Sequence, residues 1–239
     1  PSGPGLVAET AVMIDASTGS VLFDKKCHQK MYPASITKIM TALLTIENCN
    51  LDDTVTFSQS AIDTLEPEAA NIGAVVGEEM SVKDCLYALM LQSANEVASA
   101  LAEHVSGSIE EFAKLMNKRA KQAGANDAHF ANACGLFNKK HYVTAYDMAK
   151  IMQAALQYPV FREIINSSSY TLPTDNKRKE PLTISQRHQM VQPWNSFHYD
   201  GIIGGKTGFV NESGTTLVTS AQRDGMTLIT VVLNSPGTN

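Results

Sequence analysis

The sequence predicts an α/β fold in which strands from both ends of the chain share one antiparallel sheet and a helical region is inserted between them. Two short apolar runs between Ala11 and Asp24 surround an Asp-Ala-Ser-Thr-Gly turn, which is typical of a β-hairpin. Residues 214–220 and 226–233 are rich in Thr, Val, Leu and Ile and surround a second turn at 222–225. Because the patterns between these ends are helical, the strands are expected to form one sheet with helices packed on it.

The clearest helical pattern starts at Ile36. Apolar residues at positions 36, 39, 40, 43 and 44 recur at the spacing of one helical face. Further helices are predicted at 82–91, 96–105, 109–122 and 144–157. The last of these is expected to end before Pro159, because the residue that precedes a proline is disfavoured in the α conformation. The polar stretch from Thr174 to Glu180 is expected to be an exposed connection rather than a domain linker.

Length and composition limit the class of protein. The chain has 239 residues, 44% of them apolar and 18% charged, which is enough for a globular domain with a sizeable core. Its 19 basic and 24 acidic residues give a net charge of -5, which argues against nucleic acid or an anionic lipid surface as a partner. No apolar run approaches the roughly 18 to 20 residues of a membrane span.

The cysteines and histidines give no sign of a metal or redox site. The cysteines, at positions 27, 49, 85 and 134, lie too far apart for a CxxC pair, so small buried thiols are their expected role. The six histidines show no HExxH or other short ligand spacing. We therefore expect no metal, no cofactor and an activity that does not depend on an ion.

Ser35 and Lys38 stand at the start of the helix predicted from Ile36. Residues three apart share one helical face with Cβ atoms roughly 5 to 6 Å apart, so the Lys38 amine is expected to reach the Ser35 hydroxyl. A lysine whose pKa is lowered by burial or by a nearby cation can take the proton of a serine nucleophile. Free N–H groups at the helix start would stabilise negative charge that develops there. The alternative is an N-capping serine with a solvated lysine.

A second candidate is the Ser-Ala-Asn segment that begins at Ser93. It falls between two predicted helices, where a polar turn would present the Ser93 hydroxyl and the Asn95 amide to a cleft. The alternative is a turn and helix cap with no chemical role.

A third candidate is the Lys-Thr-Gly segment that begins at Lys206, between a glycine-rich stretch and a strand-rich region. This context predicts part of an edge strand that lines a groove. A P-loop is excluded, because that pattern needs glycine at position 200, which is Asp200, and a helix after the motif. A lysine on a strand can instead hold a carboxylate together with backbone donors.

The three motifs each occur once, in the order that is typical of penicillin-binding proteins and class A β-lactamases. From about Ala11 to Leu233 the sequence also resembles the low-molecular-mass penicillin-binding proteins that are serine D-alanyl-D-alanine carboxypeptidases. The resemblance is carried by Tyr-Pro-Ala-Ser-Ile-Thr-Lys at 32–38, Ser-Ala-Asn-Glu-Val-Ala at 93–98, His-Phe-Ala-Asn-Ala-Cys-Gly-Leu at 129–136 and Gly-Gly-Lys-Thr-Gly-Phe at 204–209.

This resemblance implies a serine β-lactamase or transpeptidase-like form of the predicted fold, together with a mechanism. Ser35 would attack the carbonyl between the two terminal D-alanines of a peptidoglycan stem peptide, and Lys38 would take its proton. Ser93 would relay a proton to the leaving D-alanine, and water would release the acyl-enzyme. β-Lactams would be covalent inhibitors.

The resemblance also implies which residues bind the substrate. Asn95 and Gly208 belong to the matching motifs, and Lys206 would keep the site cationic. Thr207 would help to bind the terminal carboxylate, and the N–H groups of the nucleophile and of Phe209 would form the oxyanion hole.

The resemblance also implies a domain organisation and a cellular location. Residues 1–239 would be a single penicillin-binding domain of a bacterial protein that acts outside the cytoplasm, whether secreted, periplasmic or on the outer face of the cell membrane. Many relatives carry a C-terminal extension with an amphipathic anchor. The chain is expected to lack this extension and to reach a membrane only through it.

One loop differs in sequence from the family, and one arginine allows two interpretations. The family stretch Asn-Pro-x-Gly-Leu reads Asn-Ala-Cys-Gly-Leu at 132–136, which is expected to alter a loop near the site. Arg187 is expected to be a solvated loop residue, with carboxylate binding as the alternative.

Two other functions compete with the carboxypeptidase. A class A-like β-lactamase needs a glutamate with a bound water, and no acidic residue between Ser93 and Pro159 stands in a Glu-x-x-Leu-Asn pattern. A β-lactam-sensing binding domain would be acylated once, and would need membrane spans and an output domain.

Overall fold

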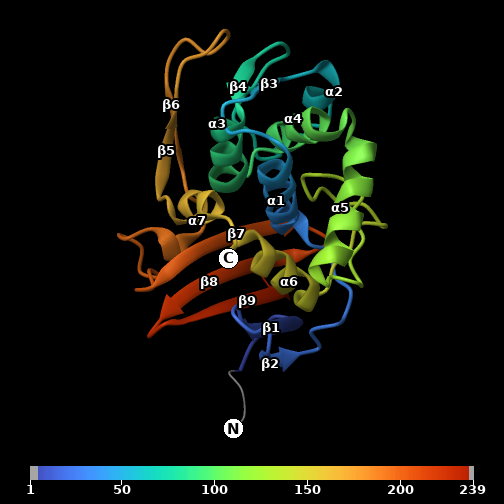
Figure 1. Cartoon of the computed structure of the whole chain (residues 1–239), viewed down its shortest axis with the longest axis vertical. Helices are drawn as coiled ribbons and strands as arrows, with labels where there is room; N and C mark the ends of the chain where they lie inside the picture. Colours follow the sequence, from blue (N-terminus) through green and yellow to red (C-terminus); the bar gives the residue numbers. More distant parts are fainter. Residues whose placement is uncertain (1–4, 237–239) are drawn as a thin grey trace.

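The main sheet unites both ends of the chain, as predicted. In the computed structural model, which describes residues 5–236, five antiparallel strands have the order β2-β1-β9-β8-β7 (Figure 1). They are β1 (Thr10–Asp15), β2 (Val21–Lys25), β7 (Ile202–Val210), β8 (Gly214–Arg223) and β9 (Met226–Ser235). β1 pairs with β9, where Val12 lies opposite Val231 and Ile14 opposite Ile229, all fully buried. β7, which carries the Lys-Thr-Gly motif, is therefore an edge strand.

The predicted helices lie between these ends. They are α1 (Lys38–Asn48), α3 (Val82–Tyr87) with its continuation η2 (Ala88–Gln92), α4 (Asn95–Ser106), α5 (Ile109–Ala123) and α6 (Ala145–Ala155). A 3-10 helix, η1 (Ala34–Thr37), precedes α1. The five apolar positions of the first predicted helix are almost completely buried. α6 packs against β1 and β9, while α3 and α4 are grouped beyond the β7 edge (Figure 1).

Several elements carry no clear signal in the sequence. Pro159 ends the preceding helix, as expected, and also begins α7 (Pro159–Asn166), because the first helical position needs no N–H partner. The other additional elements are α2 (Gln59–Asp63), η3 (Gln189–Val191) and two small antiparallel sheets, β3 (Thr54–Thr56) with β4 (Glu79–Ser81) and β5 (Ser169–Leu172) with β6 (Leu182–Ser185). Residues 174–180 form the mostly exposed end of the β5–β6 hairpin, which confirms the predicted connection.

All four cysteines are free thiols. Three of them are buried, as predicted, and Cys49 is partly exposed. Within residues 5–236, none of the helices combines the length and the apolar character that crossing a membrane requires.

Candidate active site

Ser35 lies in η1, directly before α1, with a partly exposed side chain. The preceding Ala34 has a φ of 53°, a left-handed conformation that a non-glycine residue keeps only where its surroundings fix it. Thr216 on β8 supplies one constraint, since its hydroxyl donates to the carbonyl of Pro33 (2.8 Å). Neither η1 nor α1 has a side-chain cap, so the N-capping alternative for Ser35 is wrong.

Lys38 is completely buried at the first position of α1. Its Nζ lies 3.0 Å from Ser35 Oγ. It also donates to Asn95 Oδ1 (2.6 Å) and to the carbonyl of Cys134 (2.7 Å). Burial lowers the pKa of Lys38 to about 8, which excludes the solvated-lysine alternative. A neutral amine here would donate to the two carbonyl oxygens and keep its lone pair for the Ser35 hydroxyl.

The segment 129–136 lies against the first turns of α1. Thr41 donates to the carbonyl of Ala133 (2.6 Å), and Thr37 shares a hydrogen bond with His141 Nε2 (2.9 Å). Burial lowers the pKa of His141 to about 3, so its ring is neutral. The N–H of Ala131 donates to Nδ1 of that ring, so Nε2 carries the proton and donates it to Thr37. The Ala-Cys pair, where this loop differs from the family sequence, therefore borders the site, as expected.

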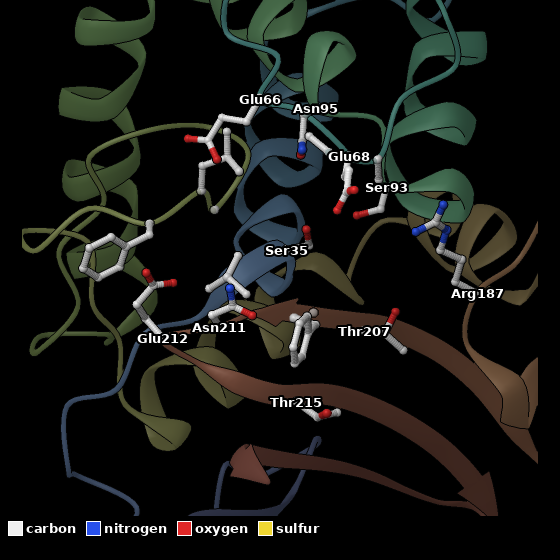
Figure 2. Close-up of a pocket in the computed structure, with 18 of the residues that line it drawn as sticks. Ser35, Glu66, Glu68, Ser93, Asn95, Arg187, Thr207, Asn211, Glu212 and Thr215 are labelled. Carbon is white, nitrogen blue, oxygen red and sulfur yellow. The ribbon is translucent and has the colours of Figure 1, made fainter. Parts of the chain in front are cut away.

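Ser93 and Asn95 reach the site from the turn between η2 and α4. Ser93 is 4% exposed and has a φ of 65°, so the turn contains a second left-handed non-glycine residue. Its hydroxyl points into the cleft (Figure 2). The side chain of Asn95 accepts a hydrogen bond from Lys38, and its N–H donates to the carbonyl of Ala70 (2.8 Å). The second motif therefore contacts the first directly.

The third motif lies along β7 at the edge of the sheet. Lys206 is 1% exposed, and its Nζ donates to the carbonyl of Thr207 (2.8 Å). Thr207 and the exposed ring of Phe209 line the cleft. No hydrogen bond between Lys206 and Ser93 is found in the described part of the chain, so the proton relay remains a prediction.

Two glycines let backbone segments approach Ser35 closely. A Cβ on Gly208 would lie 2.8 Å from the Ser35 nitrogen and 2.5 Å from Thr216 Oγ1. A Cβ on Gly135, whose φ is 92°, would lie 1.9 Å from the carbonyl oxygen of Ala34. β7 and the 129–136 segment can therefore lie against the nucleophile only because the residue at each contact is a glycine.

We expect Gly208→Ala to slow acylation of Ser35 by about 100-fold. The added methyl group would push β7 away from the Ser35 N–H, and a small displacement of reacting groups is enough to reduce the rate by this factor. The rate of labelling by a fluorescent penicillin measures this effect. Gly5→Ala is the control, since a Cβ there meets nothing within 4 Å. Labelling of Gly208→Ala at the parent rate would contradict the expectation.

An open cleft of about 790 Å³ connects these groups (Figure 2). Of the predicted residues, it is lined by Ser35, Ser93, Asn95, Thr207, Gly208 and Phe209, while Lys38 and Lys206 lie buried behind its wall. Figure 2 shows Ser93 and Arg187 on one side of Ser35, and Glu66 and Glu212 on the other. The Glu68 carboxylate also lies on the Ser93 side, so the end that holds Arg187 carries both charges, while the other end is acidic.

Arg187 is exposed, as expected, but it also lines the cleft. Its neighbours Gln186 and His188 are buried, and His188 Nε2 shares a hydrogen bond with Thr219 on β8 (2.8 Å). These contacts anchor the segment against the sheet, next to the cleft. The structure thus favours the alternative interpretation, in which Arg187 can meet a carboxylate.

Three acidic residues of the cleft were not predicted. Glu66 and Glu68 come from the segment between α2 and β4, and Glu212 comes from the β7–β8 turn. All three lie outside the range from Ser93 to Pro159 in which a class A-type glutamate is expected, and they stand in irregular segments without a motif. Only the folded arrangement brings them to the cleft.

Burial and nearby positive charge lower the pKa of both buried lysines. Burial is the main cause for Lys38, as expected, and the charge of Arg187 lowers its pKa further. The pKa of Lys206 is itself held well below its ordinary value by burial and by the charge of Lys38. The reason is that Lys206 is buried with only one hydrogen-bond acceptor, whereas Lys38 has three partners.

One group of metal-ligating side chains occurs within residues 5–236. Donor atoms of Cys49, Asp53 and His104 lie within 4.8 Å of one another. This group is at the C-terminal end of α1, whereas Ser35 precedes the N-terminal end, and none of its members lines the cleft. It offers no metal ligand to the candidate nucleophile.

The sequence and fold are similar to those of cell-wall peptidases. A profile of the D-alanyl-D-alanine carboxypeptidase family, Peptidase_S11, matches residues 1–237. The D-alanyl-D-alanine carboxypeptidase DacF of Bacillus subtilis is 35% identical over 232 residues, which are 95% of this chain and 57% of DacF. A D-alanyl-D-alanine carboxypeptidase of a Streptomyces strain is 32% identical over 97% of this chain and 82% of its own length.

Comparison with solved structures gives a similar result for the fold. A mutant of a Streptomyces DD-transpeptidase superposes with a TM-score of 0.91 at 30% identity, covering 98% of this chain and 93% of that chain. A D-alanyl-D-alanine carboxypeptidase from Mycobacterium tuberculosis gives a TM-score of 0.88 at 29% identity, covering 100% of this chain and 85% of that chain. The chain spans little more than half the length of DacF.

Proposed function

Because the chain belongs to the D-alanyl-D-alanine carboxypeptidase family, we propose that it removes the terminal D-alanine from peptidoglycan stem peptides through an acyl-enzyme on Ser35. The observation that carries this proposal is the buried Lys38 amine, 3.0 Å from the Ser35 hydroxyl at the floor of an open cleft. The protein acts where its substrate is, outside the cytoplasm of a bacterium, and residues 1–239 act as one penicillin-binding domain.

Acylation begins when neutral Lys38 takes the proton of Ser35 Oγ, which then bonds to the carbonyl carbon between the two D-alanines. The peptide C–N bond breaks, and the nitrogen receives a proton and leaves as the amine of D-alanine. Water then attacks the ester, which releases the shortened peptide acid and restores the Ser35 hydroxyl. Ser93 faces the cleft beside Ser35, where it can pass the proton to the leaving nitrogen.

Negative charge on the substrate is held at two places. The N–H groups of Ser35 and Phe209 form the oxyanion hole, which is supported by the close approach of Gly208 to the Ser35 nitrogen. The terminal carboxylate lies at the Arg187 end of the cleft, between Thr207 and Arg187, both of which line the cleft. In this placement the leaving D-alanine lies toward Ser93, and the rest of the peptide extends toward Glu66 and Glu212.

The test compares two reactions of the same preparation. We expect repeated release of D-alanine from a D-Ala-D-Ala peptide, but with penicillin a stoichiometric burst followed by a much slower steady phase. D-Alanine diffuses away after acylation, whereas the opened β-lactam stays tethered and obstructs water. Each tenfold difference between the two turnover rates corresponds to about 1.4 kcal/mol of barrier.

Other outcomes would reject the proposal. Rapid penicillin hydrolysis without a burst and without D-alanine release would favour a β-lactamase, and single acylation without peptide turnover would favour a sensing domain. The assay is repeated with EDTA, which should leave the rate unchanged. Activity that is lost with EDTA and restored by zinc would overturn the metal-free mechanism.

A further inference from the structure

The irregular segment 66–74, here called the cleft wall, separates the active-site cleft from the β3–β4 side of the molecule. Its first five residues, 66–70, line the cleft, and no helix or strand stabilises it. Glu68 has a φ of 65°, so this segment also contains a left-handed non-glycine residue. An irregular segment keeps one position only if other parts of the protein hold its backbone polar groups.

Two charged side chains hold the peptide groups of Ile72 from opposite sides. The N–H of Ile72 donates to Glu96 Oε1 (2.8 Å), and the N–H of Ala74 reaches the same oxygen at 3.5 Å. The carbonyl of Ile72 accepts from a guanidinium N–H of Arg178 (3.4 Å). Glu96 is completely buried at the start of α4, next to Asn95 in the chain.

Arg178 comes from the end of the β5–β6 hairpin and is itself fixed by a buried ion pair. Its guanidinium lies 3.0 Å from Glu78 Oε1, and the two side chains are only 15% and 2% exposed. The other oxygen of Glu78 accepts from the N–H of Val75 (2.9 Å). Asn176 adds a hydrogen bond to the carbonyl of Gly77 (2.8 Å). The hairpin is therefore tied to the chain that continues from the cleft wall.

We propose that Glu96 and Arg178 are positioning residues, which hold the peptide groups of Ile72 between them and so fix the cleft wall at the distance from Ser35 and Lys38 that acylation requires. This inference rests on the proposed function, because its readout is acylation of Ser35. It assigns a role to the distant β5–β6 hairpin, which does not line the cleft.

The cleft wall is connected to the reacting groups by a short path. The carbonyl of Ala70 accepts the N–H of Asn95, and the side chain of Asn95 accepts from Lys38. A shift of the cleft wall would therefore move Asn95 and change the orientation of the base. Displacements of about 1 Å can reduce a rate by about 100-fold even when the altered residue does not touch the substrate.

Glu96 also acts on Lys38 through its charge. Burial lowers the pKa of Lys38, while the charge of Glu96 raises it and that of Arg187 lowers it. Glu96 is in turn affected by burial, which raises its pKa, and by Lys38. Removing the Glu96 charge should therefore lower the pKa of Lys38. A purely structural change would not shift that pKa in a particular direction.

The first experiment separates position from charge at Glu96. Glu96→Gln keeps an acceptor for Ile72 and removes the charge, so the acid limb of the acylation pH profile should move to lower pH. Glu96→Asp keeps the charge but is one methylene too short to reach Ile72, so it should leave the acid limb in place and lower kcat/KM for the D-Ala-D-Ala peptide by about 10- to 100-fold. Identical pH profiles and constants for both variants and the parent would overturn the proposal.

The second experiment tests the hairpin. The double variant Glu78→Gln with Arg178→Met removes both charges of the buried ion pair. Asp175, which lies 3.9 Å from the guanidinium, keeps its hydrogen bonds from the N–H groups of residues 177 and 178. The control is Glu47→Gln with Arg119→Met, which removes a partly buried pair (18% and 19% exposed) away from the cleft wall. We expect kcat/KM for the D-Ala-D-Ala peptide to fall about tenfold or more in the first double variant and to stay at the parent value in the control.

The outcomes distinguish this inference from the proposed function. If the parent protein neither releases D-alanine nor becomes acylated, the proposed function fails. If the parent is active and the two double variants show the same kcat/KM, the positioning role of Arg178 fails. Equal thermal midpoints for the two double variants, together with different kcat/KM values, would show that the effect is on the cleft wall rather than on overall stability.

Discussion

Ser35→Ala is expected to abolish covalent labelling by penicillin and to reduce D-alanine release on the order of 10⁴-fold or more, because the Ser35 hydroxyl is the one that Lys38 contacts and can activate. Ser35 is partly exposed in the cleft and Lys38 lies 3.0 Å from its oxygen. Mass spectrometry of the labelled parent should show one adduct, on the peptide that contains Ser35.

The fold should survive this change, because the Ser35 hydroxyl makes no hydrogen bond other than that with Lys38 in residues 5–236. Ser196→Ala, at an exposed serine, is the control and should label like the parent. An adduct on another residue, or full labelling of Ser35→Ala, would show that the nucleophile has been misassigned.

Lys38→Arg should reduce acylation by about 10³-fold, within the range of about 10² to 10⁴ that a general base contributes. A guanidinium stays protonated at every working pH and cannot take the Ser35 proton. It is also larger than the amine that fits between Asn95 Oδ1 and the carbonyl of Cys134. Stopped-flow labelling with a fluorescent penicillin measures the rate.

The pH profile of the parent gives an independent check on the base. The neutral form of Lys38 is the active one, and burial lowers its pKa to about 8. The acylation rate should therefore rise with pH and reach half of its maximum near pH 8. Lys114→Arg, at an exposed lysine, should follow the parent profile. A profile that is flat through pH 8, or acylation of Lys38→Arg at the parent rate, would mean that another group is the base.

The sequence predicted the elements whose side-chain pattern is regular. The helical spacing of the apolar residues from Ile36, and the apolar and β-rich runs around a turn at each end, were enough to locate α1 and the main sheet. α7 was not predicted, because Pro159 was considered only as the end of a helix. The β5–β6 hairpin was also missed, since each of its strands has only four residues.

The site was predictable to the extent that its residues form contiguous motifs. Ser35 and Lys38 share one helical turn, so their contact follows from spacing. The acidic residues of the cleft follow from no local pattern, because the fold brings Glu66 and Glu212 to the same cleft from distant parts of the chain. The exposed Arg187 shows the same limit, since its position beside the cleft depends on buried neighbours in an irregular segment.

The pairing of β1 with β9 joins residues from almost the two ends of the described chain. Contacts between such distant segments form slowly, because a long loop must close before they stabilise anything. β8 and β9 also separate β7 from β1, so the strand that carries Lys206 has no fixed place until the last strands are synthesised. Thr216, which constrains the turn before Ser35, arrives with those strands. A chain that is still being made or exported should therefore be inert toward β-lactams, and its reactivity should appear only when its final strand docks.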